Sequence, residues 1–225
     1  MFQNRYLFIL YFLLGILYSQ PKYSIGIDVG YYQPDIPVSG TNQLPASSGF
    51  SKDILPGFSL SYNFFPGARI GFAHSFSYQS DKTKSGTPFS RILSYRMFLI
   101  ETYYFSKERL EWNFSLGPIW NKGSIKIDTE VNVSEWDNVL TGFSDGDVSI
   151  AVVNSDKMTT NWFGFASFIG LRYYVRSWWA IDIKTGYLTN YYDHESWKFQ
   201  GKTVTGPVMN IDGLPIVTVK VIFGW

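Results

Sequence analysis

The chain has 225 residues, a formal net charge of +1 and no cysteine. The lack of cysteine excludes a disulfide framework and thiolate metal ligands, and a net charge near zero provides no strong field that would attract nucleic acid. Aromatic residues make up 19% of the chain, a content that the interfacial girdles of a membrane protein accommodate more readily than a soluble core of this size.

The first 19 residues have the pattern of a secretory signal peptide. An early positive charge, Arg5, precedes an apolar run from Tyr6 to Tyr18, and the small residue Ser19 follows. The run of about thirteen residues is shorter than the ~20 that a membrane-spanning helix needs. We therefore predict a cleaved leader at residues 1–19 rather than a helical anchor, and an exported chain over residues 20–225.

Two-residue alternation of apolar with polar or small residues runs through the rest of the chain. In its first segment Tyr23, Ile25 and Ile27 alternate with Ser24 and Gly26, which is typical of a β-strand with a different environment on each face. The same pattern predicts strands, in chain order, at residues 22–32, 56–65, 70–78, 110–117, 163–173, 179–187 and 216–225.

An eighth, less regular strand is expected over residues 90–105. We expect Arg96 on its polar, inward face. The outward, apolar face is expected to carry Leu93, Tyr95, Met97 and Leu99.

The links between these strands alternate in length. Short turns are expected near residues 65–67, 106–109 and 175–177, and long polar links at residues 33–53, 80–89, 122–160 and 191–213. All long links then lie at one end of the sheet. The segment 122–160 alternates weakly, so two further spanning strands, ten in all, are an alternative. Ten strands would break the alternation of short and long links, so we favour eight strands.

Two architectures fit an alternating all-β chain, a soluble barrel or sandwich and a membrane barrel whose apolar face points outward to lipid. The second is favoured because the polar face is rich in Gly, Ala and Ser, which suit a narrow closed interior. Aromatic pairs such as Trp178 and Trp179 also cluster at strand ends. Several strands reach the ~9–11 residues that a tilted spanning strand needs. The sequence thus predicts a closed, antiparallel, up-and-down transmembrane β-barrel.

The leader, the eight amphipathic strands, the alternating links and the terminal aromatic residue resemble the small outer-membrane β-barrel proteins of Gram-negative bacteria, the OmpA/OmpX type. The resemblance is architectural and covers nearly all of residues 21–225. It implies residence in the bacterial outer membrane, contact with its lipids, and handling by periplasmic chaperones and the barrel-assembly machinery. In that family a final strand of alternating apolar residues is the assembly signal, and the matching residues here are Val217, Val219, Val221, Phe223 and Trp225. Phe is the commoner last residue in the family, so Trp225 is a small departure.

The polar faces of the predicted strands carry charged residues into the barrel. An ion-selective pore is one interpretation. We favour a network of mutually paired charges, because side chains fill the interior of an eight-stranded barrel and an unpaired buried charge is costly. The predicted lumen residues are Asp28, Arg69, Arg96, Glu111, Arg172, Asp182, Lys184 and Lys220.

The two histidines, His74 and His194, are the candidates for catalysis. A serine nucleophile and its base must lie within hydrogen-bond reach, and Ser75 and Ser77 point away from the strand face that carries His74. His194 lies in an Asp-His-Glu triplet, which is a weak signal for a protease. We expect no enzymatic activity, no metal and no cofactor. An outer-membrane lipid-modifying or proteolytic enzyme is the alternative.

Large apolar residues occur in the long polar links, at Trp136, Phe143, Trp197 and Phe199. They are candidates for contact with an extracellular ligand or protein, or for packing the links together. The expected function is structural or surface interaction. A further alternative is a secreted soluble β-barrel that binds an apolar ligand.

Overall fold

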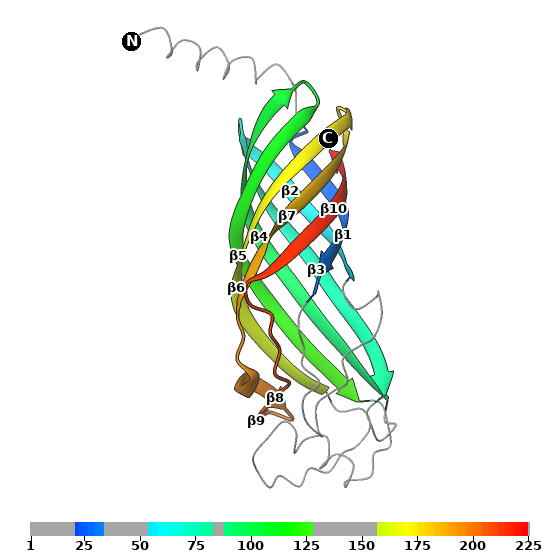
Figure 1. The fold of residues 1–225 in the computed structure, drawn as a ribbon, viewed down its shortest axis with the longest axis vertical. Coiled ribbons are helices and arrows are strands. Elements are labelled where there is room, and N and C mark those ends of the chain that lie inside the picture. Colours follow the sequence, from blue (N-terminus) through cyan, green and yellow to red (C-terminus); the bar gives the residue numbers. More distant parts are fainter. Residues whose placement is uncertain (1–20, 34–53, 83–87, 128–156, 225) are drawn as a thin grey trace, which may run out of the picture.

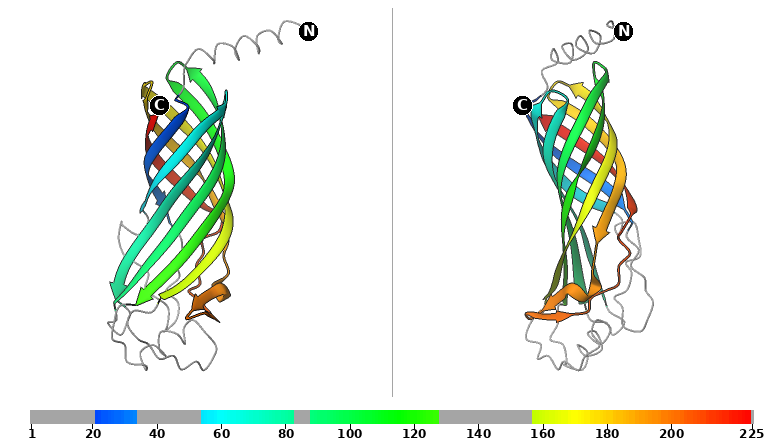
Figure 2. Two further views of the ribbon diagram at one scale, coloured as in Figure 1. Left: turned by 180° about the vertical axis from the view of Figure 1, so that it is seen from behind. Right: turned by 90° about the vertical axis from the view of Figure 1, so that its left-hand side faces the viewer.

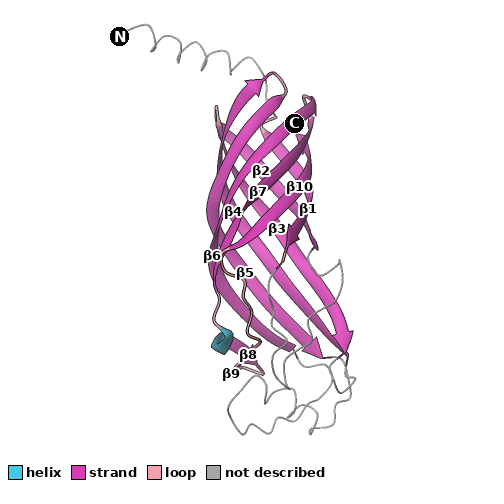
Figure 3. Ribbon diagram, viewed as in Figure 1, coloured by secondary structure: helices cyan, strands magenta, loops and turns pink. Residues whose placement is uncertain are grey.

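The fold is taken from a computed structural model that describes residues 21–33, 54–82, 88–127 and 157–224. These residues form a tall barrel of tilted antiparallel strands (Figure 1). The only helical element among them is one 3-10 turn (Figure 3), and no helix in these ranges is long and apolar enough to cross a membrane. The predicted leader, residues 1–19, lies outside them.

Eight strands form the wall, and two very short ones lie in the last long link. The elements are β1 (Tyr23–Tyr32), β2 (Ile54–Phe65), β3 (Ala68–Lys82), β4 (Pro88–Lys107), β5 (Leu110–Ile127), β6 (Lys157–Arg176), β7 (Trp179–Tyr191), η3 (His194–Ser196), β8 (Trp197–Phe199), β9 (Lys202–Val204) and β10 (Leu214–Gly224).

The wall closes into a ring of eight strands. β1 to β7 pair in sequence order, and β10 lies between β7 and β1. Across the closing seam Asp28 faces Lys220 and Tyr31 faces Val217. Within this ring every strand therefore has a hydrogen-bonded neighbour on both sides. The prediction of a closed eight-stranded barrel is confirmed. The ten-strand alternative is not confirmed. Residues 122–127 and 157–160 lengthen β5 and β6, and the ring closes with eight strands.

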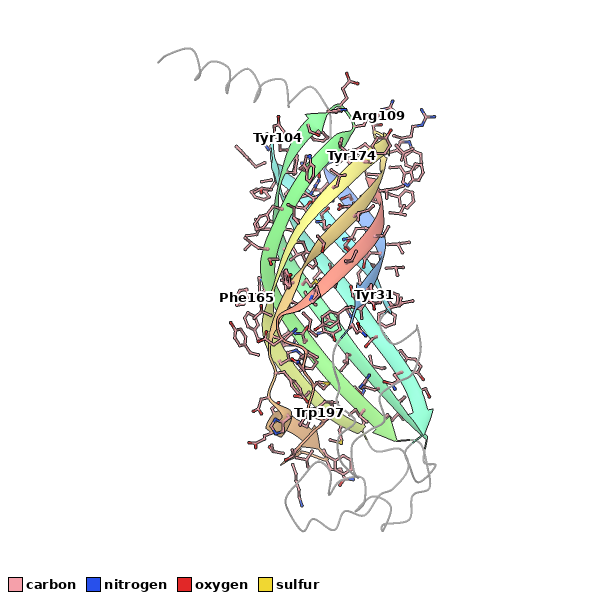
Figure 4. The ribbon with its side chains drawn as sticks, in the orientation of Figure 1. Tyr31, Tyr104, Arg109, Phe165, Tyr174 and Trp197 are labelled. Atoms are coloured by element: carbon pink, nitrogen blue, oxygen red, sulfur yellow. The ribbon has the colours of Figure 1, made fainter. Side chains whose placement is uncertain are left out.

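In the part of the barrel near the short turns, the polarity is the reverse of that in a soluble protein. Outward-facing Phe58, Phe114 and Val219 are 42%, 48% and 47% exposed, whereas inward-facing Glu111 and Asp182 are fully buried. Figure 4 shows further side chains that project from the outer surface, namely Tyr31, Tyr104 and Phe165. Apolar surface of this extent around a barrel is stable in lipid and not in water, so the soluble-barrel alternative is wrong.

The two faces of β4 are the reverse of those predicted. Arg96 lies on the outer face, because it pairs across the strands with outward-facing Trp120. The residues predicted to face outward line the interior instead, namely Leu93, Tyr95, Met97 and Leu99. The prediction failed because this strand carries large apolar residues on both faces, so alternation alone does not distinguish them.

The wall is taller on one side than on the other. β3, β4, β5 and β6 have 15, 20, 18 and 20 residues, whereas β1 has 10 and β10 has 11. A tilted strand of ~9–11 residues spans a membrane, so the four long strands continue beyond it at the loop end (Figures 1 and 2). We call this extension the projecting wall. The hairpin β8–β9 joins it by pairing with Met158 and Thr159 of β6.

Candidate functional site

Eight charged side chains meet inside the barrel, in the half nearer the short turns. Four are basic and four are acidic, and the side chains in their ion pairs are at most 13% exposed. We call this set the charged tier. Its members are Asp28, Arg69, Glu101, Glu111, Arg172, Asp182, Lys184 and Lys220.

Glu101 of β4 is the hub of the charged tier. It forms ion pairs with Arg69 and with Lys184, and Arg172 Nη2 lies 3.5 Å from its Oε1. Three cations from β3, β6 and β7 thus converge on one carboxylate. This convergence offsets the cost of burying the charges, which would be several kcal/mol for each unpaired ion.

The other ion pairs extend this tier around the ring. Arg172 also pairs with Asp182 at 2.7 Å, and Arg69 pairs with Glu111. Neutral donors complete the set, since the Tyr174 hydroxyl donates to Glu111 at 3.0 Å. The Lys220 ammonium lies 3.7 Å from Asp28, across the closing seam. The tier is electrically balanced and takes its side chains from seven of the eight wall strands.

Seven of the eight lumen residues predicted from sequence lie in the charged tier, and Arg96 does not. The sequence reading missed Glu101, which has the opposite parity to Arg96 on the same strand. Glu101 is the closer of the two to the short-turn end and so the deeper in the apolar belt. A deep carboxylate must face the interior, whereas an arginine near the rim can extend its charge toward water. The depths of Arg96 and Glu101 in the apolar belt are therefore the signal that could have identified Glu101 as the inward-facing residue.

Glycines on the inner face provide room for the charged tier. A Cβ at Gly57 would lie 2.4 Å from Asp28 Oδ1, and a Cβ at Gly26 would lie 2.8 Å from Lys220 Cδ. Real Cβ atoms do not approach other atoms so closely. The small residues on the polar face thus leave the space that the long charged side chains occupy in the lumen.

Two small spaces lie among these side chains. A cavity of about 40 Å³ is bounded in part by Glu101, Lys184 and Lys220, and a second, of about 10 Å³, lies near Tyr174. Arg69 and Arg172 line both cavities. A water molecule needs about 10–15 Å³ of such volume, so these spaces have room for a few water molecules. The arginines between them fill the lumen at this level.

Toward the long links the interior becomes mostly apolar, with Gln79 and Arg91 as buried polar exceptions. We call this second set the apolar tier, and its buried members include Tyr32, Leu55, Leu93, Tyr95, Met97, Ile119, Phe168, Leu188 and Ile216. Tyr32 and Tyr95 meet edge to face, with ring centroids 5.6 Å apart. The Tyr32 hydroxyl donates to the Ile211 carbonyl at 2.9 Å, which satisfies its polar end inside an apolar environment.

Residues 192–213 fold over the loop end of the apolar tier and form what we call the cap. Asn190, at the end of β7, holds the returning chain, because its side-chain amide donates to the Ile211 carbonyl at 2.7 Å and its backbone N–H donates to Asp212 at 2.9 Å. Asn121 and Trp162 both donate to the Asn190 side-chain oxygen. The cap is therefore fastened to the wall by polar contacts.

Trp197 is the anchor of the cap (Figure 4). It is fully buried, and its indole N–H donates to the Tyr192 hydroxyl at 2.8 Å, which in turn donates to the Pro207 carbonyl at 2.6 Å. Burial raises the pKa of Tyr192. A Cβ at Gly206 would lie 2.0 Å from the Trp197 ring, so only glycine fits under this ring.

The four aromatic candidates of the long links divide into two groups. Trp197 and Phe199 are 0% and 1% exposed, so they pack the cap against the wall and do not present a contact surface. Trp136 and Phe143 lie outside the described residues. The terminal Trp225 of the assembly signal also lies outside them, whereas Val217, Val219 and Phe223 project outward from β10.

The histidines do not form a recognisable catalytic centre in the described part of the chain. His74 faces outward from β3, and its Nε2 lies 2.7 Å from Ser94 Oγ on β4. This contact joins two strands, so the spacing of residues along one strand does not reveal it. Its cross-strand neighbours are Phe58 and Arg96, and no hydrogen bond joins its ring to a carboxylate of the described residues. His194 lies in a turn that Asp193 caps. Among the described residues no group of three acidic or histidine side chains is placed to hold a metal.

The arrangement is shared with solved membrane proteins. Neisserial surface protein A has a TM-score of 0.51 at 8% identity, over 91% of this chain and 97% of that one. OprG of Pseudomonas aeruginosa has a TM-score of 0.50 at 12% identity, over 92% and 98%. The fold is that of a small outer-membrane barrel.

A third similar structure, a major outer membrane protein of Thermus thermophilus, has a TM-score of 0.51 at 7% identity, over 90% of this chain and 99% of that one. No family model and no curated protein matches the sequence. The barrel fold is thus confirmed by structure alone, at identities too low to transfer a ligand or an activity.

Proposed function

We propose that the protein is an integral, non-enzymatic protein of a bacterial outer membrane, and that its filled barrel anchors a raised platform at the cell surface. The observation that carries this proposal is the interior itself. The charged tier fills the lumen within the apolar belt, and the apolar tier fills the projecting wall. A barrel filled at two levels suits an anchor and not a channel.

The loop end supports the second half of the proposal. The projecting wall and the cap share one apolar core, in which Trp197 and Phe199 are buried. Such a core holds the bases of the long links in fixed positions above the membrane. A rigid base is what binding loops require, and we propose an extracellular ligand or protein as the partner of those links. Delivery by periplasmic chaperones and the barrel-assembly machinery, with β10 as the signal, belongs to the same proposal.

Conductance across a planar lipid bilayer tests the filled lumen. The protein, refolded from residues 20–225, should insert into lipid, show heat-modifiable gel mobility and pass no steady ionic current. The matched variant is Arg172→Ala, which removes a side chain that lines both cavities and should open brief, small-conductance events. A steady current through the wild-type protein would contradict the proposal.

A lipid-modifying enzyme is the second candidate, and the His74–Ser94 contact favours it. Turnover of a bacterial lipid by the wild type that is lost in Ser94→Ala, and kept in Ser77→Ala, would establish it. We expect no turnover, because a base without an orienting acceptor is poorly held for proton transfer.

A further inference from the structure

Among the described residues, the outward-facing charges of the projecting wall are all basic. Arg96 on β4 and Lys122 on β5 occupy neighbouring cross-strand rows, since Arg96 pairs with Trp120 and Lys122 with Ser94. Two rows further toward the loop end, Lys126 faces Lys157 directly. We call this set the outer basic field, and its members are Arg96, Lys122, Lys126 and Lys157.

The outer basic field begins where the apolar belt ends. On β5 the outward positions are apolar from Leu110 to Trp120, and the next outward residue is Lys122. On β6 the outward residues run through Phe165 and Phe163, and then change to Asn161. Because belt and field share one continuous outer face, the field lies at the height where lipid headgroups meet the wall.

No carboxylate of the described residues pairs with Arg96, Lys122 or Lys157. The ion-paired carboxylates of the wall strands all point into the lumen. A surface built this way is complementary to an anion that comes from outside the chain.

The residues between the basic side chains fit the same kind of partner. Asn161 and Thr159 lie next to Lys157 on the outer face of β6. Hydroxyl and amide groups donate hydrogen bonds to phosphate and sugar oxygens, and lysine and arginine supply the opposite charge. The field thus combines charge and hydrogen-bond donors beside an aromatic rim.

We propose that the outer basic field is a docking surface for phosphate-bearing headgroups of lipids in the leaflet that surrounds the loop end. The proposal rests on the placement of the barrel under Proposed function. β4, β5 and β6 then do more than raise the links, because their outer face holds a shell of anionic lipid beside the projecting wall. Basic groups near an anionic lipid surface each strengthen binding by about fivefold.

Native mass spectrometry of the refolded chain in a neutral detergent tests the proposal. The probes are lipid A, a diphosphorylated glucosamine lipid, and phosphatidylcholine as the zwitterionic comparison. We expect lipid A to bind the wild type in preference to phosphatidylcholine, and inorganic phosphate at equal concentration not to displace it. The triple variant Arg96→Gln, Lys122→Gln, Lys157→Gln should weaken lipid A binding by about a hundredfold.

The matched control is Lys107→Gln, Arg109→Gln, Arg176→Gln, which removes the same charge from exposed positions at the short-turn end. It should bind lipid A as the wild type does, and both triple variants should keep heat-modifiable mobility. Equal binding of the two lipids by the wild type, or an equal loss in the two variants, would overturn the docking surface. A chain that fails to insert into lipid at all would instead overturn the proposed function.

Discussion

The membrane-embedded barrel and the projecting wall follow opposite rules of polarity along the same strands. Within the belt, β5 turns Trp112 and Phe114 outward and Glu111 inward. Beyond it, the same strand turns Lys122 outward and buries Ile125. The surroundings of the wall change from the hydrocarbon core of the membrane to the headgroup region and water between these levels, and each face takes the polarity that its surroundings require.

The interiors of the two regions differ in the same way. The charged tier depends on ion pairs of defined geometry, in which each charge needs its partner. The apolar tier depends on volume and burial, which tolerate small rearrangements better. The comparison indicates that a defect in the first region should be felt by the whole barrel. A defect in the second should be felt mainly by the cap and the loop end.

The largest expected effect comes from removing the charge at the hub. Glu101→Gln leaves Arg69, Lys184 and Arg172 short of one negative charge in a buried site, and should lower the free energy of unfolding by about 3–5 kcal/mol. Urea unfolding of the protein in lipid vesicles measures it. The control is Glu108→Gln in the exposed β4–β5 turn, for which a change within about 0.5 kcal/mol is expected. Equal effects of the two changes would remove the distinction between the regions.

The next effect concerns the cap. Trp197→Ala removes a fully buried indole and should cost about 3 kcal/mol, confined to residues 192–213. Limited proteolysis should then cut the cap quickly while the barrel stays resistant and heat-modifiable. Trp178→Ala, at a position that is 55% exposed, serves as the control and should not change the cutting rate. Loss of the whole barrel in the Trp197 variant would show that the two regions are not separable.

The smallest effect tests the contact that joins the apolar tier to the cap. Tyr32→Phe removes the hydroxyl that donates to the Ile211 carbonyl, and should cost about 1 kcal/mol. Hydrogen exchange should speed up in the returning chain near residues 211–212 and stay unchanged in β2 and β3. Tyr31→Phe, on the outward face of the same strand, should change neither. Faster exchange throughout the barrel would contradict a local role.

Most of the wall could be predicted from sequence, and the exception has a physical cause. For β1, β5 and β10 one face is apolar and the other is small or charged, so period and polarity agree. β4 has apolar residues on its outer face at Phe98 and Ile100, and on its inner face at Leu93 and Tyr95. Toward the loop end its inner face becomes apolar, while Ile92 keeps an apolar residue on its outer face. A rule that assumes one environment per face must fail on such a strand.

From the sequence by itself one could derive the number of wall strands, the end of the barrel at which the long links lie, and the inward direction of seven charged residues. Alternation and the cost of charge in lipid are properties of single strands, and these features follow from them. Only the tertiary structure decided that Glu101 gathers three cations, that Trp197 seals the loop end, and that the outward lysines of β5 and β6 lie side by side. Those facts depend on which strands become neighbours when the ring closes and on how far each rises beyond the membrane. Neither is written in the pattern of one strand.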